Sequence, residues 1–189
     1  MTGDLVLASA SPRRLALLTQ AGLTPAVRPS HVDETPMPAE PAIAYALRIA
    51  SSKCLAAASP RSMLVLAADT VVHVDELIYG KPAAAGDAVR MLRELAGGWH
   101  QVTTAYALAG AGALRELAAV TTRVRFRQLA AADIERYVAS GEPMDKAGAY
   151  GIQGLGGALI DQVEGSYTNV VGLPLPEVLA ALARHGVTP

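Results

Sequence analysis

The chain has 189 residues, of which 51% are hydrophobic and only 4% aromatic, and its formal net charge is −1. This length suits one domain over residues 1–189, with a core built from Ala, Val, Leu and Ile rather than from aromatic rings. The near-neutral charge disfavours binding to polymeric nucleic acid, and because no apolar run reaches the roughly 18 residues of a membrane span, we expect no membrane partner.

The first expected elements are a strand and a helix. Residues 1–4 lack the basic region, followed by a long apolar segment, with which a signal peptide begins, so we expect a cytoplasmic protein. The apolar residues 4–8 predict a short buried strand. Residues 12–21 predict a helix, with Ser11 as its N-cap and Pro12 at the first helical position.

The turn between these elements, Ser9-Ala10-Ser11-Pro12-Arg13-Arg14, is a candidate anion site. Ser9 and Ser11 supply hydroxyl groups, and Arg13 and Arg14 supply guanidinium groups that can bind phosphate through two N–H donors at once. The free N–H groups of a helix N-terminus also attract anions. The alternative is an ordinary capped helix with two solvated arginines, and this hexapeptide alone does not decide between them.

A loop and a second helix follow. After an extended piece over residues 26–29, the four prolines of residues 29–41 predict a loop that carries Glu34. Residues 42–58 predict a helix with Lys53 beside its apolar stripe. That stripe contains Cys54, the only cysteine, so an internal disulfide and a cysteine-clustered zinc site are excluded, and a reducing compartment is expected.

The next strand is expected to end at a carboxylate. Residues 63–68 form an apolar run typical of a central strand, and we expect the strand to end at Asp69-Thr70, which places Asp69 at its edge. Residues 71–79 predict a hairpin that leads into Gly80-Lys81-Pro82.

The second half of the chain alternates strands, helices and loops. Residues 146–157 are rich in glycine and predict a loop shaped by its backbone, and residues 165–169 predict a second, polar loop. The other expected elements are helices at residues 87–96, 132–140 and 177–184 and strands at residues 99–109, 114–126 and 158–163.

Lysine is rare in this chain. Of the 16 basic residues, 13 are arginine and only Lys53, Lys81 and Lys146 are lysine. If arginine is used wherever a surface charge suffices, the remaining lysines are candidates for sites that need a compact, flexible ammonium group.

Several familiar motifs are absent from the sequence. Pro82 follows Gly80-Lys81 where a P-loop needs Ser or Thr, no Gly-x-Ser-x-Gly elbow occurs, and the four histidines lack metal-ligand spacing. What remains is a set of cationic and hydroxyl groups together with the carboxylates Glu34 and Asp69. A polyphosphate with a divalent metal needs this mixture, because carboxylates bind Mg²⁺ while cationic groups neutralise phosphate oxygens.

The sequence resembles the Maf family of nucleoside triphosphate pyrophosphatases along nearly its whole length. The resemblance is carried by short motifs that occur in the right order. These motifs are Leu7-Ala8-Ser9-Ala10-Ser11-Pro12-Arg13-Arg14, Asp33-Glu34, Ala68-Asp69-Thr70-Val71-Val72, Gly80-Lys81-Pro82, Asp145-Lys146-Ala147-Gly148-Ala149-Tyr150-Gly151-Ile152-Gln153-Gly154, and Gly165-Ser166-Tyr167 with Val171-Gly172-Leu173-Pro174.

The resemblance implies an α/β fold, an elongated mixed sheet flanked by helices with a central cleft between two lobes, usually in a homodimer. It also implies that water attacks the α-phosphorus of a nucleoside triphosphate and releases the monophosphate and pyrophosphate, with Mg²⁺ or Mn²⁺ as cofactor. Asp69 is the implied proton acceptor, Glu34 lies near the metal or the attacking water, and both carboxylates are candidate metal ligands. The implied substrate contacts are Ser9, Ser11, Arg13, Arg14, Lys53, Lys81 and Lys146.

Within the family, the sequence is similar to the branch that prefers dTTP and UTP. That branch links base choice to Arg13, Thr70 and Gln153, and the Gln153 amide can pair with the N3–H and O4 edge that thymine and uracil share. Modified pyrimidine triphosphates present the same edge. The alternatives are a pyrophosphatase for 7-methyl-GTP or damaged purine nucleotides, and a nucleotide-binding regulator of septum formation that needs no turnover.

Overall fold

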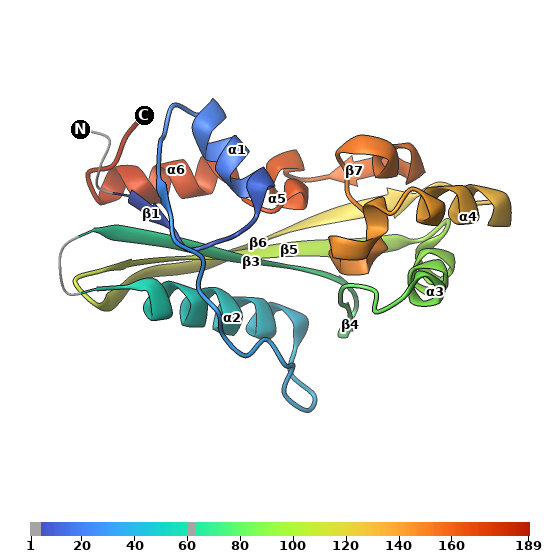
Figure 1. Cartoon of the computed structure of the whole chain (residues 1–189), viewed down its shortest axis with the longest axis horizontal. Helices are drawn as coiled ribbons and strands as arrows, with labels where there is room; N and C mark the ends of the chain where they lie inside the picture. Colours follow the sequence, from blue (N-terminus) through green and yellow to red (C-terminus); the bar gives the residue numbers. More distant parts are fainter. Residues whose placement is uncertain (1–4, 60–62) are drawn as a thin grey trace. The chain divides into compact units, whose positions relative to one another are not determined.

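The structure is a computed structural model that describes residues 5–59 and 63–189 (Figure 1). The chain divides into two compact units. The first unit comprises Met1–Thr70, Thr104–Val120 and Gly172–Pro189, and the second comprises Val71–Thr103 and Thr121–Val171.

Most helices and strands begin and end within one or two residues of their predicted positions. The helices are α1 (Pro12–Gln20), α2 (Ala42–Ala57), α3 (Ala85–Leu95), α4 (Ala131–Ala139), α5 (Tyr167–Val171) and α6 (Leu175–Arg184). The strands are β1 (Leu5–Leu7), β2 (Ala26–Val27), β3 (Leu64–Val74), β4 (Leu77–Tyr79), β5 (Trp99–Gly110), β6 (Ala113–Phe126) and β7 (Ile160–Glu164). Short 3₁₀ turns follow α4: η1 (Glu142–Asp145), η2 (Ala147–Ala149) and η3 (Gly154–Leu159).

The strands form a mixed sheet in the order β2-β1-β3-β5-β6-β7, with β4 paired to β3. β1 is parallel to β2 and β3, whereas β4 is antiparallel to β3 and β7 is antiparallel to β6. The prediction of an α/β fold with a mixed sheet flanked by helices is confirmed. No helix among the described residues is long and apolar enough to cross a bilayer.

In the first unit, helices cover both faces of the strands. Figure 1 shows α2 on one face and α1 and α6 on the other. The core is aliphatic, and its fully buried side chains are Leu7, Leu18, Ile49, Leu66, Leu108, Leu173 and Leu182. Because helices cover both faces of the sheet here (Figure 1), the residues of β1 are buried on both faces, which explains its continuous apolar run.

The second unit has its own core, to which aromatic rings contribute. Phe126, Tyr150 and His100 pack edge to face with ring centroids 4.7, 4.9 and 5.3 Å apart. Leu92 of α3 and Ile134 of α4 are buried in the same cluster. His100 is thus a buried residue that packs against the aromatic rings of this core.

The predicted end of the central strand is wrong. β3 continues past Asp69 and Thr70 to Val74, so both polar residues lie in the strand interior and not at its edge. Polar side chains can occupy such positions when their hydrogen-bonding groups have partners. Here Lys53 Nζ lies 2.7 Å from Asp69 Oδ1, and Arg14 Nη2 donates to Thr70 Oγ1 at 3.0 Å.

The polar loop predicted over residues 165–169 is also wrong in part, because α5 begins within it. Ser166 Oγ accepts the N–H of Asn169 at 3.2 Å, as an N-cap does. The buried Asn169 side chain donates to the carbonyl of Val102 (2.9 Å) and to Thr122 Oγ1 (3.0 Å). Tertiary contacts therefore stabilise a helix of only five residues.

Gly148 is a position where the fold requires glycine. Its φ is +67°, and an added Cβ would lie 2.8 Å from Val72 Cγ1. We expect Gly148→Ala to lower the free energy of unfolding by about 2–4 kcal/mol, because left-handed strain and a steric clash add together. Urea unfolding measures the loss.

Gly141→Ala is the matched control in the same unit. Gly141 has a φ of +77°, but no atom lies within 4 Å of an added Cβ. This variant should lose only the strain contribution of about 1–2 kcal/mol. Equal losses in the two variants would contradict a cost for the contact with Val72.

Candidate functional site

The N-terminal turn is organised by the guanidinium group of Arg14 in α1. Nε donates to the carbonyl oxygen of Gly172 at 2.8 Å, Nη1 donates to Ser9 Oγ at 3.0 Å and Nη2 donates to Thr70 Oγ1 at 3.0 Å. Burial lowers the pKa of Arg14, and the Asp69 carboxylate acts in the opposite direction, but an arginine keeps its charge in proteins. One side chain thus holds three separate segments of the first unit.

Ser9 Oγ also accepts the N–H of Ser11 at 3.2 Å. Ser11 is the N-cap residue of α1 and Pro12 is in its first turn, as predicted, but the Ser11 side chain makes no capping hydrogen bond within the described chain. The Ser11 side chain therefore does not cover the first N–H groups of α1. Arg13 is half-buried in the same turn.

Lys53 in α2 lies between two carboxylates. Its Nζ is 2.8 Å from Glu34 Oε1 and 2.7 Å from Asp69 Oδ1. The side chains of Lys53 and Asp69 are 12% and 9% exposed, whereas that of Glu34 is 51% exposed. An ionised carboxylate is costly to bury without a partner, so the ammonium group stabilises Asp69 inside the sheet.

The two groups of residues meet on β3, because Asp69 and Thr70 are neighbours in that strand. Thr70 Oγ1, which Arg14 contacts, is also 2.9 Å from Thr104 Oγ1 in β5. The first unit therefore brings hydroxyl, guanidinium and ammonium groups together with two carboxylates.

The loop that carries Glu34 is attached to α2 by Arg48. The Arg48 guanidinium donates to both carboxylate oxygens of Glu40, at 2.6 and 2.7 Å, and to the carbonyl oxygen of Thr35 at 3.1 Å. Paired hydrogen bonds of this kind fix the orientation of both groups. The backbone next to Glu34 is thereby fixed to α2.

Tyr45 adds a direct contact to Glu34. Its hydroxyl donates to the Glu34 carbonyl oxygen at 2.9 Å, and burial raises the pKa of Tyr45 to about 12, so the donor keeps its proton. Our sequence reasoning missed both Tyr45 and Arg48. The available signal was a tyrosine and an arginine three residues apart at the start of the helix that follows the proline-rich loop.

In the second unit, two of the predicted motifs lie together. The carbonyl oxygen of Gly80 accepts the N–H of Gly148 at 3.0 Å, which connects the turn before Lys81 to the glycine-rich segment. Lys81 is exposed. Gln153 is also exposed, at the start of η3.

Lys146 is folded onto its own segment. Its Nζ donates to the carbonyl oxygen of Glu142 at 2.7 Å and pairs with Asp145 Oδ1 at 2.6 Å. Gly151 leaves room for its aliphatic chain, since a Cβ there would lie 2.7 Å from Lys146 Cε. Protein oxygens therefore already bind this ammonium group.

Glu34 and Asp69 have the chemistry of a partial metal site. Among residues 5–59 and 63–189, no group of three or more His, Cys, Asp or Glu side chains could hold a metal ion. The two carboxylates nevertheless direct oxygens at one cation, the Lys53 ammonium. Mg²⁺ is commonly bound by one or two carboxylates together with water and substrate phosphates, so this donor set fits an ion that binds with a nucleotide.

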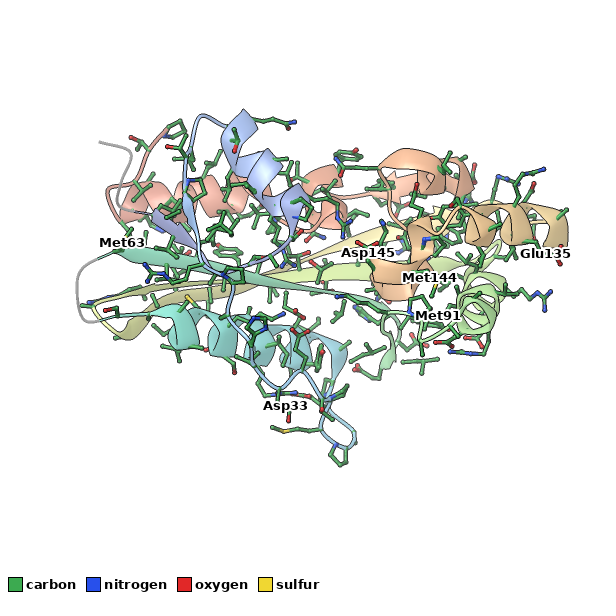
Figure 2. All side chains as sticks on the ribbon, viewed as in Figure 1. Asp33, Met63, Met91, Glu135, Met144 and Asp145 are labelled. Carbon is green, nitrogen blue, oxygen red and sulfur yellow. The ribbon has the colours of Figure 1, made fainter. Side chains whose placement is uncertain are left out.

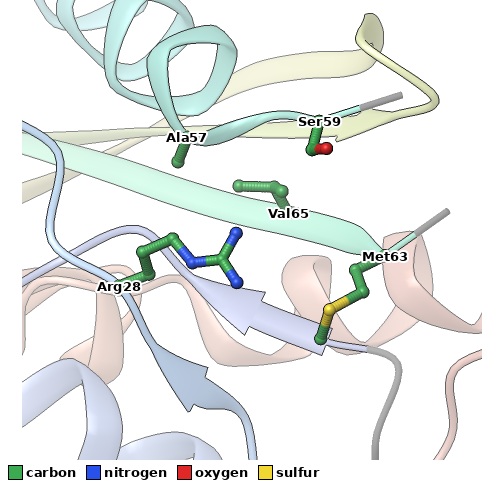
Figure 3. Close-up of a pocket in the computed structure, with 5 residues that line it drawn as sticks. All are labelled: Arg28, Ala57, Ser59, Met63 and Val65. Carbon is green, nitrogen blue, oxygen red and sulfur yellow. The ribbon is translucent and has the colours of Figure 1, made fainter. Parts of the chain in front are cut away.

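A small pocket of about 200 Å³ lies elsewhere in the first unit. Its lining residues are Arg28, Ala57, Ser59, Met63 and Val65 (Figure 3). None of them belongs to the residues that the sequence singled out, and Arg28 is the one charged residue among these five. We therefore place the candidate site around Asp69 and Thr70 of β3 and not in this pocket.

The Glu40–Arg48 pair predicts a pH dependence of stability. Arg48 lowers the pKa of Glu40 from 4.5 to about 2, so ionised Glu40 stabilises the fold above its ordinary pKa, and this contribution is lost as the pH falls through that range. We expect the stability difference between the wild-type chain and Glu40→Gln to be constant above about pH 5 and to shrink below it. Urea unfolding at a series of pH values measures this difference.

Glu177→Gln, which removes an exposed carboxylate from α6, controls for the loss of one negative charge. If the wild-type chain remains more stable to urea than Glu40→Gln by the same free energy down to about pH 3, the role of the Glu40–Arg48 ion pair is contradicted.

Comparison with known proteins places the chain among related sequences. A family model described as Maf-like protein matches residues 4–185. The dTTP/UTP pyrophosphatase of Anaeromyxobacter sp. (strain Fw109-5) is 52% identical over 98% of this chain and 91% of the relative. That of Methylobacillus flagellatus is 49% identical over 97% of this chain and 93% of the relative. A HAM1 protein from Coxiella burnetii, 16% identical, covers 97% of this chain and 100% of its own with a TM-score of 0.58, which shows a shared fold.

Proposed function

Because this chain belongs to the Maf family, we propose that it hydrolyses dTTP and UTP, and modified pyrimidine triphosphates, to the monophosphate and pyrophosphate. The structural observation that carries the proposal is the position of Lys53 between Glu34 and Asp69, beside the arginine turn. The cationic side chains can bind phosphate oxygens. The carboxylates can bind a metal ion and accept a proton.

In the proposed reaction, a water oxygen bonds to the α-phosphorus and the bond from that phosphorus to the bridging oxygen of the β-phosphate breaks. Pyrophosphate leaves, and Asp69 accepts the proton of the water. A carboxylate offers about four acceptor positions on its two oxygens, so Asp69 can bind Lys53 and a water molecule at the same time.

We assign the phosphate contacts to Ser9, Ser11, Arg13, Lys53 and Lys81. We also propose that Arg14 and Lys146 contribute to substrate binding, mainly through the groups that they hold, since three N–H groups of Arg14 and two of Lys146 donate to protein oxygens. This assignment is supported by the family motifs and, for Ser9, Ser11 and Lys53, by their contacts in the first unit.

Glu34 and Asp69 would hold the divalent ion, Mg²⁺ or Mn²⁺. When bound, the ion neutralises charge on the phosphate oxygens. The contacts from Tyr45 and Arg48 would keep Glu34 in position for this role, because they fix its backbone to the helix that carries Lys53.

Base choice is assigned to Arg13, Thr70 and Gln153. The Gln153 amide offers one acceptor and two donors, which match the N3–H and O4 groups of thymine and uracil. The names of relatives about 50% identical to this chain support a pyrimidine substrate over a purine.

We also propose that the enzyme is a homodimer, as the family resemblance implies, and that it works in the cytoplasm. The compartment is inferred from the cysteine count, because a chain with one cysteine forms no internal disulfide, as is usual in a reducing compartment.

Asp69→Asn tests the proton acceptor. We expect nucleotide binding to stay close to wild type while turnover falls by about a hundredfold or more, as for a lost general base. Pyrophosphate release measures turnover, and titration calorimetry measures binding. Asp161→Asn, at an exposed position of β7, is the control and should keep its activity. A variant of Asp69 that keeps most of its rate would contradict this role.

Gln153→Glu tests base recognition. The carboxylate places an acceptor where the amide donates to a base carbonyl, so hydrolysis of dTTP and UTP should weaken more than that of other nucleotides. A pyrophosphate-release panel over natural and modified triphosphates, with and without Mg²⁺, measures the change. Equal relative rates would exclude Gln153 from base reading, and release from purine triphosphates alone would overturn the proposed substrate class.

A further inference from the structure

Gln153 precedes a turn whose backbone is bound by a single carboxylate, that of Glu142. The N–H of Leu155 donates to Glu142 Oε2 and the N–H of Gly156 donates to Glu142 Oε1, both at 2.9 Å. These two amides follow Gln153 by two and three residues. One side chain from η1 therefore fixes the first part of η3.

Tyr137 of α4 holds the other side of the same segment. Its hydroxyl donates to Glu142 Oε1 at 3.0 Å and accepts the N–H of Gly151 at 3.4 Å. Tyr137 is buried in the core of the second unit, and burial raises the pKa of its hydroxyl, which keeps its proton. Gln153 thus lies between two bound stretches of backbone, at Gly151 and at residues 155–156.

Close packing shows that this segment is built around the Glu142 side chain. Gly154 has a φ of +76°, and an added Cβ would lie 2.7 Å from Glu142 Oε2. At Gly156, a Cβ would lie 2.4 Å from the carbonyl oxygen of Gly151. Glycine at position 154 therefore lets the backbone lie against the Glu142 carboxylate, and glycine at position 156 lets it lie against the backbone of Gly151.

The carboxylate is suited to this task because it is ionised. Burial acts to raise the pKa of Glu142. The pKa nevertheless lies below its usual range, because Gly156, Leu155 and Tyr137 all donate hydrogen bonds to the carboxylate. An ionised carboxylate only accepts hydrogen bonds, so it can serve three donors at two oxygens. A neutral amide of the same size replaces one of these oxygens with a donor.

We propose that Glu142 is a positioning residue for base selection: by fixing the turn next to Gln153, it holds the Gln153 amide where a pyrimidine base can pair with it. This inference rests on the proposed function of Gln153. Discrimination by hydrogen bonds requires donors and acceptors at fixed positions, and an amide on a mobile turn binds the correct base and its competitors more equally.

Glu142→Gln is the direct test, with UTP and CTP as substrates because they differ only in the base edge that an amide reads. We expect the ratio of kcat/KM for UTP to that for CTP to fall by about fivefold or more, mainly through a higher KM for UTP. Hydrogen exchange at the amides of Leu155 and Gly156 should become about tenfold faster, because a protecting acceptor is lost.

Glu135→Gln is the matched control. Glu135 is exposed on α4, two residues before Tyr137, and its side chain is labelled in Figure 2. The substitution makes the same change of charge on the helix that carries Tyr137, and it should alter neither the ratio of kcat/KM values nor the exchange rates. Tyr137→Phe is the second variant, should Glu142→Gln fail to fold. It removes one donor to Glu142 and the acceptor for Gly151, so it should lower the ratio in the same direction.

A double-mutant cycle separates a positioning role from a general loss of structure. Gln153→Ala should lower the UTP to CTP ratio by itself, and adding Glu142→Gln to it should lower the ratio no further, because Glu142 acts through Gln153. If Gln153→Ala lowers the ratio but Glu142→Gln leaves the ratio unchanged, with or without faster exchange, the inference is overturned and the proposed function stands. If Gln153→Ala leaves the ratio unchanged, the proposed base contact fails and the role of Glu142 in base selection fails with it.

Discussion

The ammonium group of Lys53 joins three parts of the first unit that are far apart in the sequence. Lys53 belongs to α2, and its partners are Glu34 in the proline-rich loop and Asp69 in the interior of β3. An ionised carboxylate at that position without a cation beside it would cost several kcal/mol, in the range of about 3–5 kcal/mol for a broken buried pair. The pair stabilises the Asp69 carboxylate inside a sheet, and the proposed role of Asp69 as proton acceptor requires such a carboxylate.

Arginine and lysine have different tasks around β3. Arg14 uses the fixed fork of its guanidinium to bind Ser9, Thr70 and Gly172 at once, which a lysine ammonium cannot reproduce with the same geometry. Lys53 acts as a compact charge between two carboxylates. The turn that we assign to phosphate is therefore shaped by the protein before any nucleotide binds, which reduces the entropy lost on binding.

Each unit positions one of the side chains proposed for the site on an irregular segment, and it does so in the same way. The Glu34 loop is bound to α2 by Arg48 and Tyr45, and the segment around Gln153 is bound by Glu142 and Tyr137. The Glu34 loop is held by a tyrosine hydroxyl and an arginine–glutamate ion pair, and the segment around Gln153 by a tyrosine hydroxyl and a carboxylate. These contacts replace the backbone hydrogen bonds that a helix or strand would supply. Irregular segments can then expose a reactive group without becoming mobile.

The sequence by itself determined the elements whose signals are local. Apolar runs, the N-cap and the proline-rich loop predicted nearly every helix and strand, and the motif order identified the family. Only the tertiary structure decided that β3 continues through Asp69 and that Glu142 binds the turn next to Gln153. Lys53 lies 16 residues from Asp69 in the sequence, and Glu142 lies 14 residues from Gly156. The free-energy cost of burying a polar group depends on whether such a partner binds it. No local pattern shows whether a distant partner is present.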